Sequence, residues 1–448
     1  MRSRVSSLAA SFLLLFILVS AQNLFAKTIT DTLALKVISE KPAESAPAIA
    51  KLRELGPAGL NTLFQTYARE IDEQIANPLL VATPEWQRLS AALDTVSQQK
   101  DSYLSGLYWY TDFAQAKAAA RAEDKPILSL RLLGKLNEEY SCANSRFFRT
   151  ILYSNAEVSK LLREKFILYW ESERPAPRVT IDFGDGRKLE RTLTGNSIHY
   201  VLDSDGRVID ALPGLYGPAA FMRSLNEVEA VSKYWGQEPD AGGTRPPYWA
   251  YQPDRLRRIT AEWLRDSERI GGKAPKGFTV YRDEQGRATA MEVADRAMTK
   301  MVTEATILQG LTAGPEALGK MTYDAAWNKI AQLHLADAQL DARSIGLIKR
   351  QTQRGLLAYN SKVNPDTTLK ALIEKLQANI ALDMVRNEYL LHTKLYVWLI
   401  AEHQQSELSA LNKRVYAELF LTPASDPWLG LYSPDVYTAL QGGGLSRN

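Results

Sequence analysis

The stretch from Trp109 to Phe221 constrains the fold of this chain more than any other, because its hydrophobic period changes several times. A short amphipathic helical pattern follows the tryptophan, and an apolar strand follows Lys125-Pro126. A polar loop then carries the only cysteine, Cys142, and leads into a helix, a second strand, a hairpin, two more strands and a final helix. Strand and helix patterns that alternate in this way predict an α/β domain.

Several segments of this stretch, in the same order, carry a resemblance to a known family. They read Asp112-Phe113-Ala114-Gln115-Ala116 through Lys125-Pro126-Ile127-Leu128, Cys142 through Ser145, Asn155-Ala156-Glu157-Val158 with Phe166-Ile167-Leu168, His199 through Val208, and Pro213-Gly214-Leu215-Tyr216. Together they resemble the thioredoxin-like superfamily, over roughly a quarter of the chain. The resemblance implies a thioredoxin-like sandwich, a mixed central sheet with flanking helices, with Cys142 at the start of a helix.

The chain departs from the pattern of that family at three positions. Ser145 replaces the second, resolving cysteine, Ser141 stands where a tryptophan usually precedes the first cysteine, and Ser197 occupies the slot of the cis-proline. A thiolate without a resolving partner cannot complete an intramolecular dithiol–disulfide cycle. The motif Cys142-x-x-Ser145 resembles the monothiol variants of the superfamily, which form mixed disulfides instead.

Cys142, Ser145 and His199 are the candidate catalytic residues. A helix N-terminus stabilises a thiolate and lowers its pKa, whereas the neighbouring Glu138 and Glu139 act in the opposite direction, so a reactive and an unreactive Cys142 both stay open. In the implied fold the strand of His199 ends near the cysteine loop, where an imidazole can pair with the thiol. The alternative is a strand histidine that faces the core or solvent.

Composition and the N-terminus give the class of protein. With 448 residues, 45% hydrophobic and 23% charged, the chain is long enough for two or three globular domains. A net charge of +3 without a clustered basic face argues against nucleic-acid binding. Arg2 and Arg4, the short apolar run from Leu8 to Val19 and small residues behind it predict a cleaved signal peptide, hence an exported, periplasmic or extracellular protein without a stable membrane span.

The sequence divides into five parts. We expect a signal peptide over residues 1–26, an all-helical lead-in over 27–104, the thioredoxin-like domain over 105–238, a Pro/Gly-rich linker over 239–253 and a C-terminal helical bundle over 254–448. Thr83-Pro84 predicts a helix start in the lead-in, and Gly184-Asp185-Gly186 predicts a hairpin in the central domain.

No metal or cofactor is expected. The four histidines lack metal-ligand spacing: His199, His334, His392 and His403. Glu388 and His392 are four residues apart on one predicted long helix, 367–405, whereas di-iron bundles use a spacing of three. The polar residues Asp383, Arg386, Asn387 and Glu388 interrupt the apolar stripe of this helix, either as a ligand or partner site inside the bundle or as a satisfied polar network.

Two functions follow from these residues. The first is an exported thioredoxin-like protein without autonomous dithiol oxidoreductase activity, which acts as a binding or scaffold module for an unidentified protein partner. The second is a monothiol thiol–disulfide exchange enzyme or isomerase that uses Cys142 and forms a mixed disulfide with another chain. The missing resolving cysteine favours the first.

The first prediction is that the unaltered protein does not turn over disulfides by itself, because the Ser145 hydroxyl cannot supply a second thiolate. Insulin reduction with a coupled electron donor measures this, and the expected rate equals that of the Cys142→Ser variant. Turnover by the unaltered protein that Cys142→Ser abolishes would instead establish the enzyme.

Overall fold

The computed structural model describes residues 30–235, 237, 247–272, 275, 277, 288–312, 325–358, 365–402 and 407–432. The chain forms two compact units, Met1–Tyr108 and Trp109–Asn448, and each is described by itself. The predicted signal peptide over 1–26, the predicted linker up to residue 246 and His403 lie outside the described residues.

The first unit is helical, and prolines begin three of its helices. These are α2 (Pro42–Glu54), α3 (Pro57–Thr66) and α5 (Pro84–Ser97), whereas α4 (Ala68–Ala76) begins without one. Proline is tolerated at the first position because its missing N–H has no intrahelical acceptor there. Thr83 caps α5 as the sequence predicts, accepting a hydrogen bond from the backbone N–H of Trp86 at 3.1 Å. Leucines face inward from α2, α3 and α5: Leu52, Leu60, Leu63, Leu89 and Leu93.

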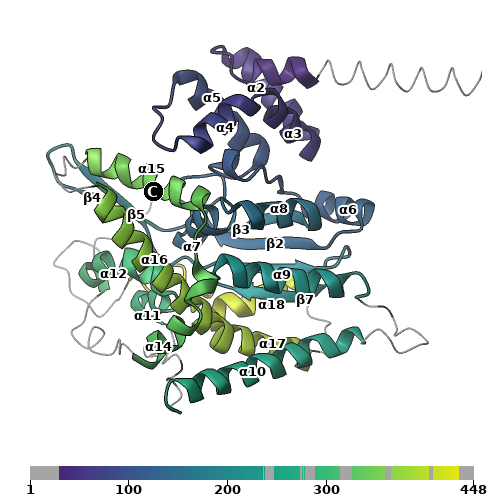
Figure 1. The fold of residues 1–448 in the computed structure, drawn as a ribbon, viewed down its shortest axis with the longest axis vertical. Coiled ribbons are helices and arrows are strands. Elements are labelled where there is room, and N and C mark those ends of the chain that lie inside the picture. Colours follow the sequence, from purple (N-terminus) through teal and green to yellow (C-terminus); the bar gives the residue numbers. More distant parts are fainter. Residues whose placement is uncertain are drawn as a thin grey trace, which may run out of the picture. The chain divides into compact units, whose positions relative to one another are not determined.

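The second unit contains a five-stranded mixed sheet in the order β1-β3-β2-β6-β7 (Figure 1). Its strands are β1 (Trp109–Tyr110), β2 (Ile127–Leu133), β3 (Ile167–Arg174), β6 (Ile198–Leu202) and β7 (Val208–Pro213). The pairs β1–β3 and β2–β3 are parallel, and the pairs β2–β6 and β6–β7 are antiparallel. A mixed sheet with many flanking helices confirms the predicted α/β class.

Strand β2 lies at the centre of the sheet because its residues suit a strand covered on both faces. All seven residues of Ile127–Leu133 are buried, as the nearly continuous apolar run predicts. The charged exception, Arg131, pairs with Glu171 on the neighbouring strand β3. The predicted hairpin forms a separate two-stranded sheet, β4 (Arg178–Asp182) with β5 (Lys188–Thr192).

Three helical segments lie in the connections between strands, and a fourth follows the last strand of the sheet, β7. They are α6 (Phe113–Glu123), α7 (Ala143–Phe147), which continues as the π-helical segment η2 (Phe148–Leu152), α8 (Ala156–Lys165) and α9 (Pro218–Ser232). Asn155 caps α8 by accepting hydrogen bonds from the backbone N–H groups of Glu157 and Val158. Asp203 and Gly206 form the turn between β6 and β7, in line with the sequence.

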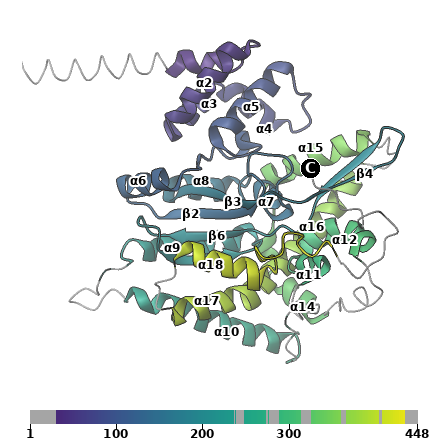
Figure 2. The same ribbon diagram turned by 180° about the vertical axis from the view of Figure 1, so that it is seen from behind.

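The C-terminal part of the second unit is helical. Its elements are η3 (Tyr248–Ala250), α10 (Tyr251–Arg269), α11 (Ala290–Asp295), α12 (Met298–Thr312), α14 (Ala325–Leu333), η4 (Leu335–Ala338), α15 (Ala342–Ala358), α16 (Pro365–Arg386), η5 (Asn387–His392), α17 (Thr393–Ala401), α18 (Leu408–Arg414) and η6 (Val415–Leu419). Figure 2 shows α18 beside β6, where the hydroxyl of Tyr200 donates to the side chain of Asn412 at 3.1 Å.

The segments on either side of residues 239–253 share one compact unit, although the sequence analysis places them in separate domains. Residues 248–253 are helical and not extended, because Pro253 is the third residue of α10. Proline in the first turn removes no intrahelical hydrogen bond. The cluster of prolines and glycines therefore predicted a linker at a place where helix α10 begins.

The long helix predicted over 367–405 is present as α16, η5 and α17 in continuous succession, with its last residues outside the described part. Its central segment η5 is π-helical, which inserts an extra residue into the turn. Asp383, near the end of α16, is buried and accepts hydrogen bonds from the first backbone N–H groups of α12, those of Met298 and Thr299. It thus caps one helix from another.

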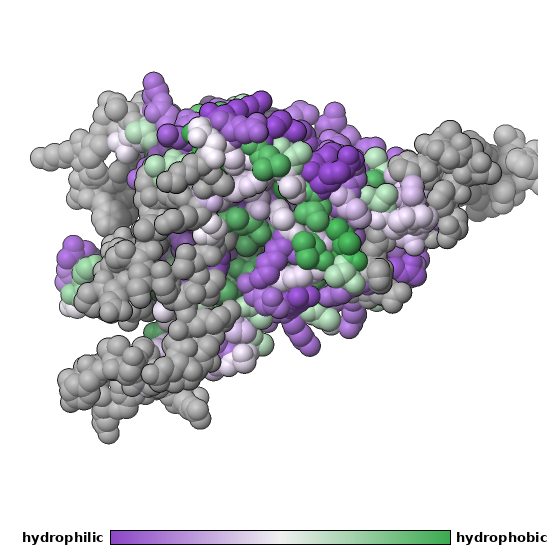
Figure 3. Space-filling model, turned by 90° about the horizontal axis from the view of Figure 1, so that it is seen from below, coloured by the Kyte–Doolittle hydropathy of each residue, from purple (hydrophilic) through white to green (hydrophobic). Residues whose placement is uncertain are grey.

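The surface seen from below the view of Figure 1 has apolar areas between hydrophilic ones (Figure 3). Leu264 of α10 and Val397 of α17 are the large apolar side chains that these two helices expose most. None of the helices among the described residues combines the length and the apolar character of a membrane span.

The second prediction concerns Asp383. The Asp383→Ala substitution leaves one buried and one partly buried backbone N–H group of α12 without an acceptor, so the free energy of unfolding is expected to fall by about 1–3 kcal/mol. Denaturant unfolding measures this change. Glu374→Ala is the matched control, at an exposed position of α16, the helix that carries Asp383. It should change the free energy of unfolding by less than about 0.5 kcal/mol. Equal effects of both substitutions would contradict the capping role.

Candidate functional site

Cys142 and Ser145 lie together, as predicted. Cys142 precedes α7 directly, and its side chain is fully buried. Its sulfur lies 3.4 Å from the hydroxyl of Ser145 and 3.1 Å from the hydroxyl of Ser197. The serine in the expected cis-proline slot therefore contacts the thiol.

The segment 193–197 closes over this thiol. A Cβ atom on Gly195 would lie only 2.1 Å from the Cβ of Cys142, so the backbone contacts the cysteine side chain directly. Thr194 has a φ of 62° and donates its backbone N–H to the carboxylate of Glu304 on α12 at 3.1 Å. An attacking reagent reaches the sulfur only after this segment opens.

Buried charges on α12 lie behind the segment. The ammonium of Lys300 is fully buried, donates to the carbonyl of Val293 at 3.0 Å and lies 3.9 Å from the carboxylate of Glu304. Burial lowers the pKa of Lys300 and raises the pKa of Glu304, and the charge of each opposes the shift of the other. These groups form an internal ion pair and not an accessible catalytic pair.

His199 does not pair with Cys142 and is instead buried among aromatic side chains. Its Nε2 lies 2.6 Å from the hydroxyl of Tyr153. The centroid of its ring lies 4.6 Å from that of Phe148 and 5.1 Å from that of Phe221. Burial lowers the pKa of His199 to about 3, so the imidazole is neutral. Within the described residues no hydrogen bond joins it to Cys142.

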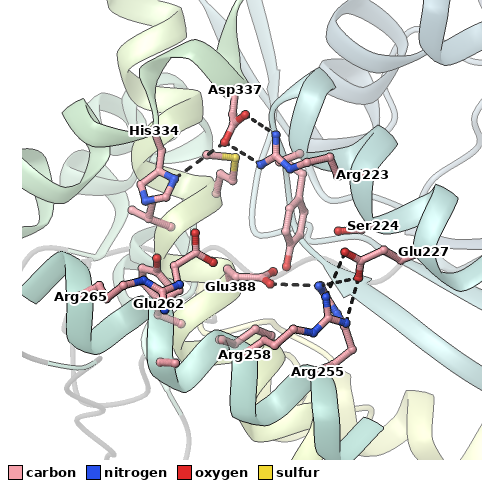
Figure 4. A pocket seen from close by; sticks show the side chains of 17 residues that line it. Arg223, Ser224, Glu227, Arg255, Arg258, Glu262, Arg265, His334, Asp337 and Glu388 are labelled. Carbon is pink, nitrogen blue, oxygen red and sulfur yellow. Dashed lines mark hydrogen bonds and ion pairs between the residues drawn. The ribbon is translucent and has the colours of Figure 1, made fainter. Parts of the chain in front are cut away.

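A cavity of about 300 Å³ opens elsewhere in the second unit. It lies between α9, α10, η4 and the α16–η5 helix (Figure 4). The lining residues are Tyr216, Ala220, Arg223, Ser224, Glu227, Arg255, Arg258, Ile259, Ala261, Glu262, Arg265, His334, Asp337, Met384, Val385, Glu388 and Tyr389. A concave site with convergent polar groups is the usual form of a small-molecule site.

One wall of the cavity is fixed around His334. Its Nε2 lies 2.6 Å from the buried carboxylate of Asp266, and its Nδ1 lies 3.8 Å from Asp337. The hydrogen bond to Asp337 raises the pKa of His334 to about 9 against the effect of burial, and Asp266 adds to the rise. Arg223 pairs with both oxygens of Asp337, at 2.5 and 2.8 Å, and Tyr389 donates to Asp266 at 2.7 Å.

The facing wall is fixed around His392. The imidazole lies between two carboxylates, with Nδ1 3.0 Å from Glu388 and Nε2 3.1 Å from Asp210 of strand β7. Burial disfavours the charged imidazole, but the two carboxylates outweigh it and raise the pKa of His392 to about 9. Tyr251 and Tyr396 donate to the second oxygen of Asp210 at 2.5 and 2.9 Å, and Arg255 lies 3.4 Å from Glu388.

The polar residues that the sequence singled out on α16 and η5 have different roles. Glu388 lines the cavity, whereas Asp383 caps α12 and Asn387 donates to the carbonyl of Leu215. Arg386 binds Asp295. Asp383, Arg386 and Asn387 thus belong to a polar network, as one alternative expects. The other alternative, a ligand site at Glu388, stays a prediction.

Sequence reasoning missed the remainder of the cavity. The charged pattern of α10, with Arg255, Arg258, Glu262 and Arg265 at three- and four-residue steps, was the available signal. It marks one helix face but does not name the elements opposite. In the part of the chain that the structure describes, no group of three acidic, histidine or cysteine residues has the arrangement of a metal site.

No family model matches the chain, and neither a curated protein nor a solved structure is significantly similar to it.

The third prediction is a loss of stability at alkaline pH. Because the folded pKa values of His334 and His392 exceed the unfolded value of about 6.5, their contribution is complete below that pH and is lost as pH rises through about 9. The free energy of unfolding should fall by roughly 2–3 kcal/mol for each of the two groups between pH 6.5 and 9.5.

Denaturant unfolding across this range measures the slope. The His334→Gln variant should have a shallower slope because it lacks one of the two groups. A slope that is unchanged in the variant, or a free energy that rises with pH, would contradict the assignment. His199, neutral in the fold, adds a small slope of opposite sign just above pH 6.5 and almost none above about pH 7.5, where its imidazole is also neutral in the unfolded chain.

Proposed function

We propose that this protein is an exported binding module of thioredoxin-like architecture, without autonomous dithiol oxidoreductase activity, and that it binds a small polar molecule in the cavity between α9, α10, η4 and α16–η5. The thioredoxin-like part of the proposal is supported by the order of elements and by the position of Cys142 directly before α7. Export is supported by the N-terminal sequence pattern. The proposed scaffold role also includes binding of a protein partner that is not identified.

One observation supports binding over thiol chemistry. The only thiol is covered by the segment 193–197, whereas the cavity is open and most of its charged side chains are already held by internal ion pairs. Preformed walls reduce the ordering that a ligand would otherwise require.

Binding is also favoured over catalysis in the cavity. Both nitrogens of His334 and both nitrogens of His392 face carboxylates, so neither imidazole is available as a general base. The carboxylate of Glu388 has a lowered pKa, because His392 outweighs the effect of burial, which makes it a weak base. The hydroxyl of Ser224 has no hydrogen-bonded base among the described residues.

The monothiol exchange enzyme is the second candidate. The observation that favours it is the position of Cys142 directly before α7, with the Ser145 hydroxyl 3.4 Å from its sulfur, as a Cys-x-x-Ser site requires. It requires the segment 193–197 to move away from the sulfur. The insulin assay with the Cys142→Ser control decides between the two candidates.

The fourth prediction is that small polar molecules stabilise the protein through the cavity. In a thermal-shift screen of neutral, anionic, cationic and zwitterionic compounds, a ligand at 100 times its Kd adds about 2.7 kcal/mol to the stability. Ala261→Phe fills the cavity from α10 and should abolish the shift.

Leu264→Phe, at an exposed position of the same helix that does not line the cavity, is the matched control and should leave the shift intact. The proposal fails when no compound stabilises the protein, or when Ala261→Phe leaves every shift unchanged.

A further inference from the structure

Two opposite charges on the same wall of the cavity make no hydrogen bond or ion pair within the part of the chain that the structure describes. Glu262 and Arg265 both belong to α10 and both line the cavity. Residues three apart on a helix are neighbours and often form an ion pair, yet neither side chain has a hydrogen bond or ion pair among the described residues. Figure 4 shows both around the opening that Glu388 also faces.

The other charged side chains of the cavity differ from Glu262 and Arg265 because they already form ion pairs with one another. Arg223 binds Asp337, and Arg255 lies between Glu227 and Glu388. Arg258 also binds Glu227. A ligand that took any of these groups would have to break an existing ion pair. Glu262 and Arg265 hold no such pair, and Arg223 and His334 attract Glu262 only by their charge, without a hydrogen bond.

The overall charge of the lining restricts the ligand further. Five cationic side chains, Arg223, Arg255, Arg258, Arg265 and His334, face four anionic ones, Glu227, Glu262, Asp337 and Glu388. A simple anion would meet the carboxylates of Glu262 and Glu388, and a simple cation would meet the guanidinium groups. A molecule that carries both charges fits a lining that is nearly neutral yet strongly polar.

Size and reach agree with a small dipolar ligand. The cavity of about 300 Å³ holds roughly ten water molecules at about 30 Å³ each. Side chains three apart on a helix have Cβ atoms about 5–6 Å apart, so their flexible ends can reach two charged groups on one small molecule. The unpartnered hydroxyl of Ser224, on α9, adds a donor and an acceptor on the opposite wall.

We propose that the cavity binds a small zwitterion of the α-amino acid class, from a free amino acid to a dipeptide, with its ammonium group at Glu262 and its carboxylate at Arg265. This inference rests on the proposed function and adds the chemistry of the ligand. No covalent step is involved.

The fifth prediction is tested by calorimetric titration of the full chain with the twenty amino acids and a set of dipeptides. Each ligand that binds is compared with its N-acetyl derivative, which lacks the ammonium charge, and with its carboxamide, which lacks the carboxylate charge. Both derivatives should bind at least about tenfold more weakly, because a charge-assisted hydrogen bond is lost.

Two variants assign the ends of the ligand. Glu262→Gln should weaken the free amino acid about tenfold or more and remove its advantage over the N-acetyl derivative, whereas Arg265→Gln should remove the advantage over the carboxamide. The matched controls are Glu268→Gln on α10 and Lys370→Gln on α16, exposed charges that do not line the cavity, and they should leave affinity unchanged.

The outcomes separate this inference from the function on which it rests. Binding of inorganic phosphate or acetate that depends on Arg265 but not on Glu262 would overturn the zwitterion while the cavity stays a binding site. Binding of neutral compounds only, blocked by Ala261→Phe, would do the same. Failure of every compound in the thermal-shift screen would overturn both proposals.

Discussion

The buried chain of Asp210, His392 and Glu388 is the interaction on which the second unit depends most. It joins the edge strand β7 to the long helix of α16, η5 and α17, over a sequence separation of 182 residues between Asp210 and His392. Two carboxylates around one imidazole would be expensive to bury if the imidazole were neutral. The proton on His392 therefore holds the sheet and the helical region together, and the hydroxyls of Tyr251 and Tyr396 satisfy the remaining oxygen of Asp210.

The π-helical segment η5 makes this arrangement possible within one helix. Asn387 and Glu388 are adjacent in sequence, yet Asn387 donates to the carbonyl of Leu215 while Glu388 contacts His392 and Arg255. The extra residue of a π-turn shifts the phase of the helix and brings polar groups to positions that a regular α-helix would give to the apolar stripe. The same segment contributes Glu388 and Tyr389 to the cavity.

The sequence predicted the local elements better than their assembly. The apolar run of β2, the Asp-Gly hairpin and the cap of Thr83 follow from neighbouring residues, and each is present. The end of the predicted linker proved helical, because Pro253 is compatible with the first turn of α10. Glu388 and His392 stood out by their spacing, but Asp210 lies on a strand far away in the sequence, and periodicity carries no information about such a contact. The thioredoxin-like assignment stays a proposal for the same reason, since it depends on arrangement and not on any single pattern.

The contact between Gly195 and Cys142 gives this protein a built-in reporter. A single thiol that is sealed in the native state reacts with a label only during moments when its cover has opened, so the labelling rate measures the free energy of that local opening. Under conditions where closing is faster than labelling, the rate is proportional to the population of the opened state. The labelling rate of the lone cysteine thus reports how often the core around α7 opens locally in the native protein.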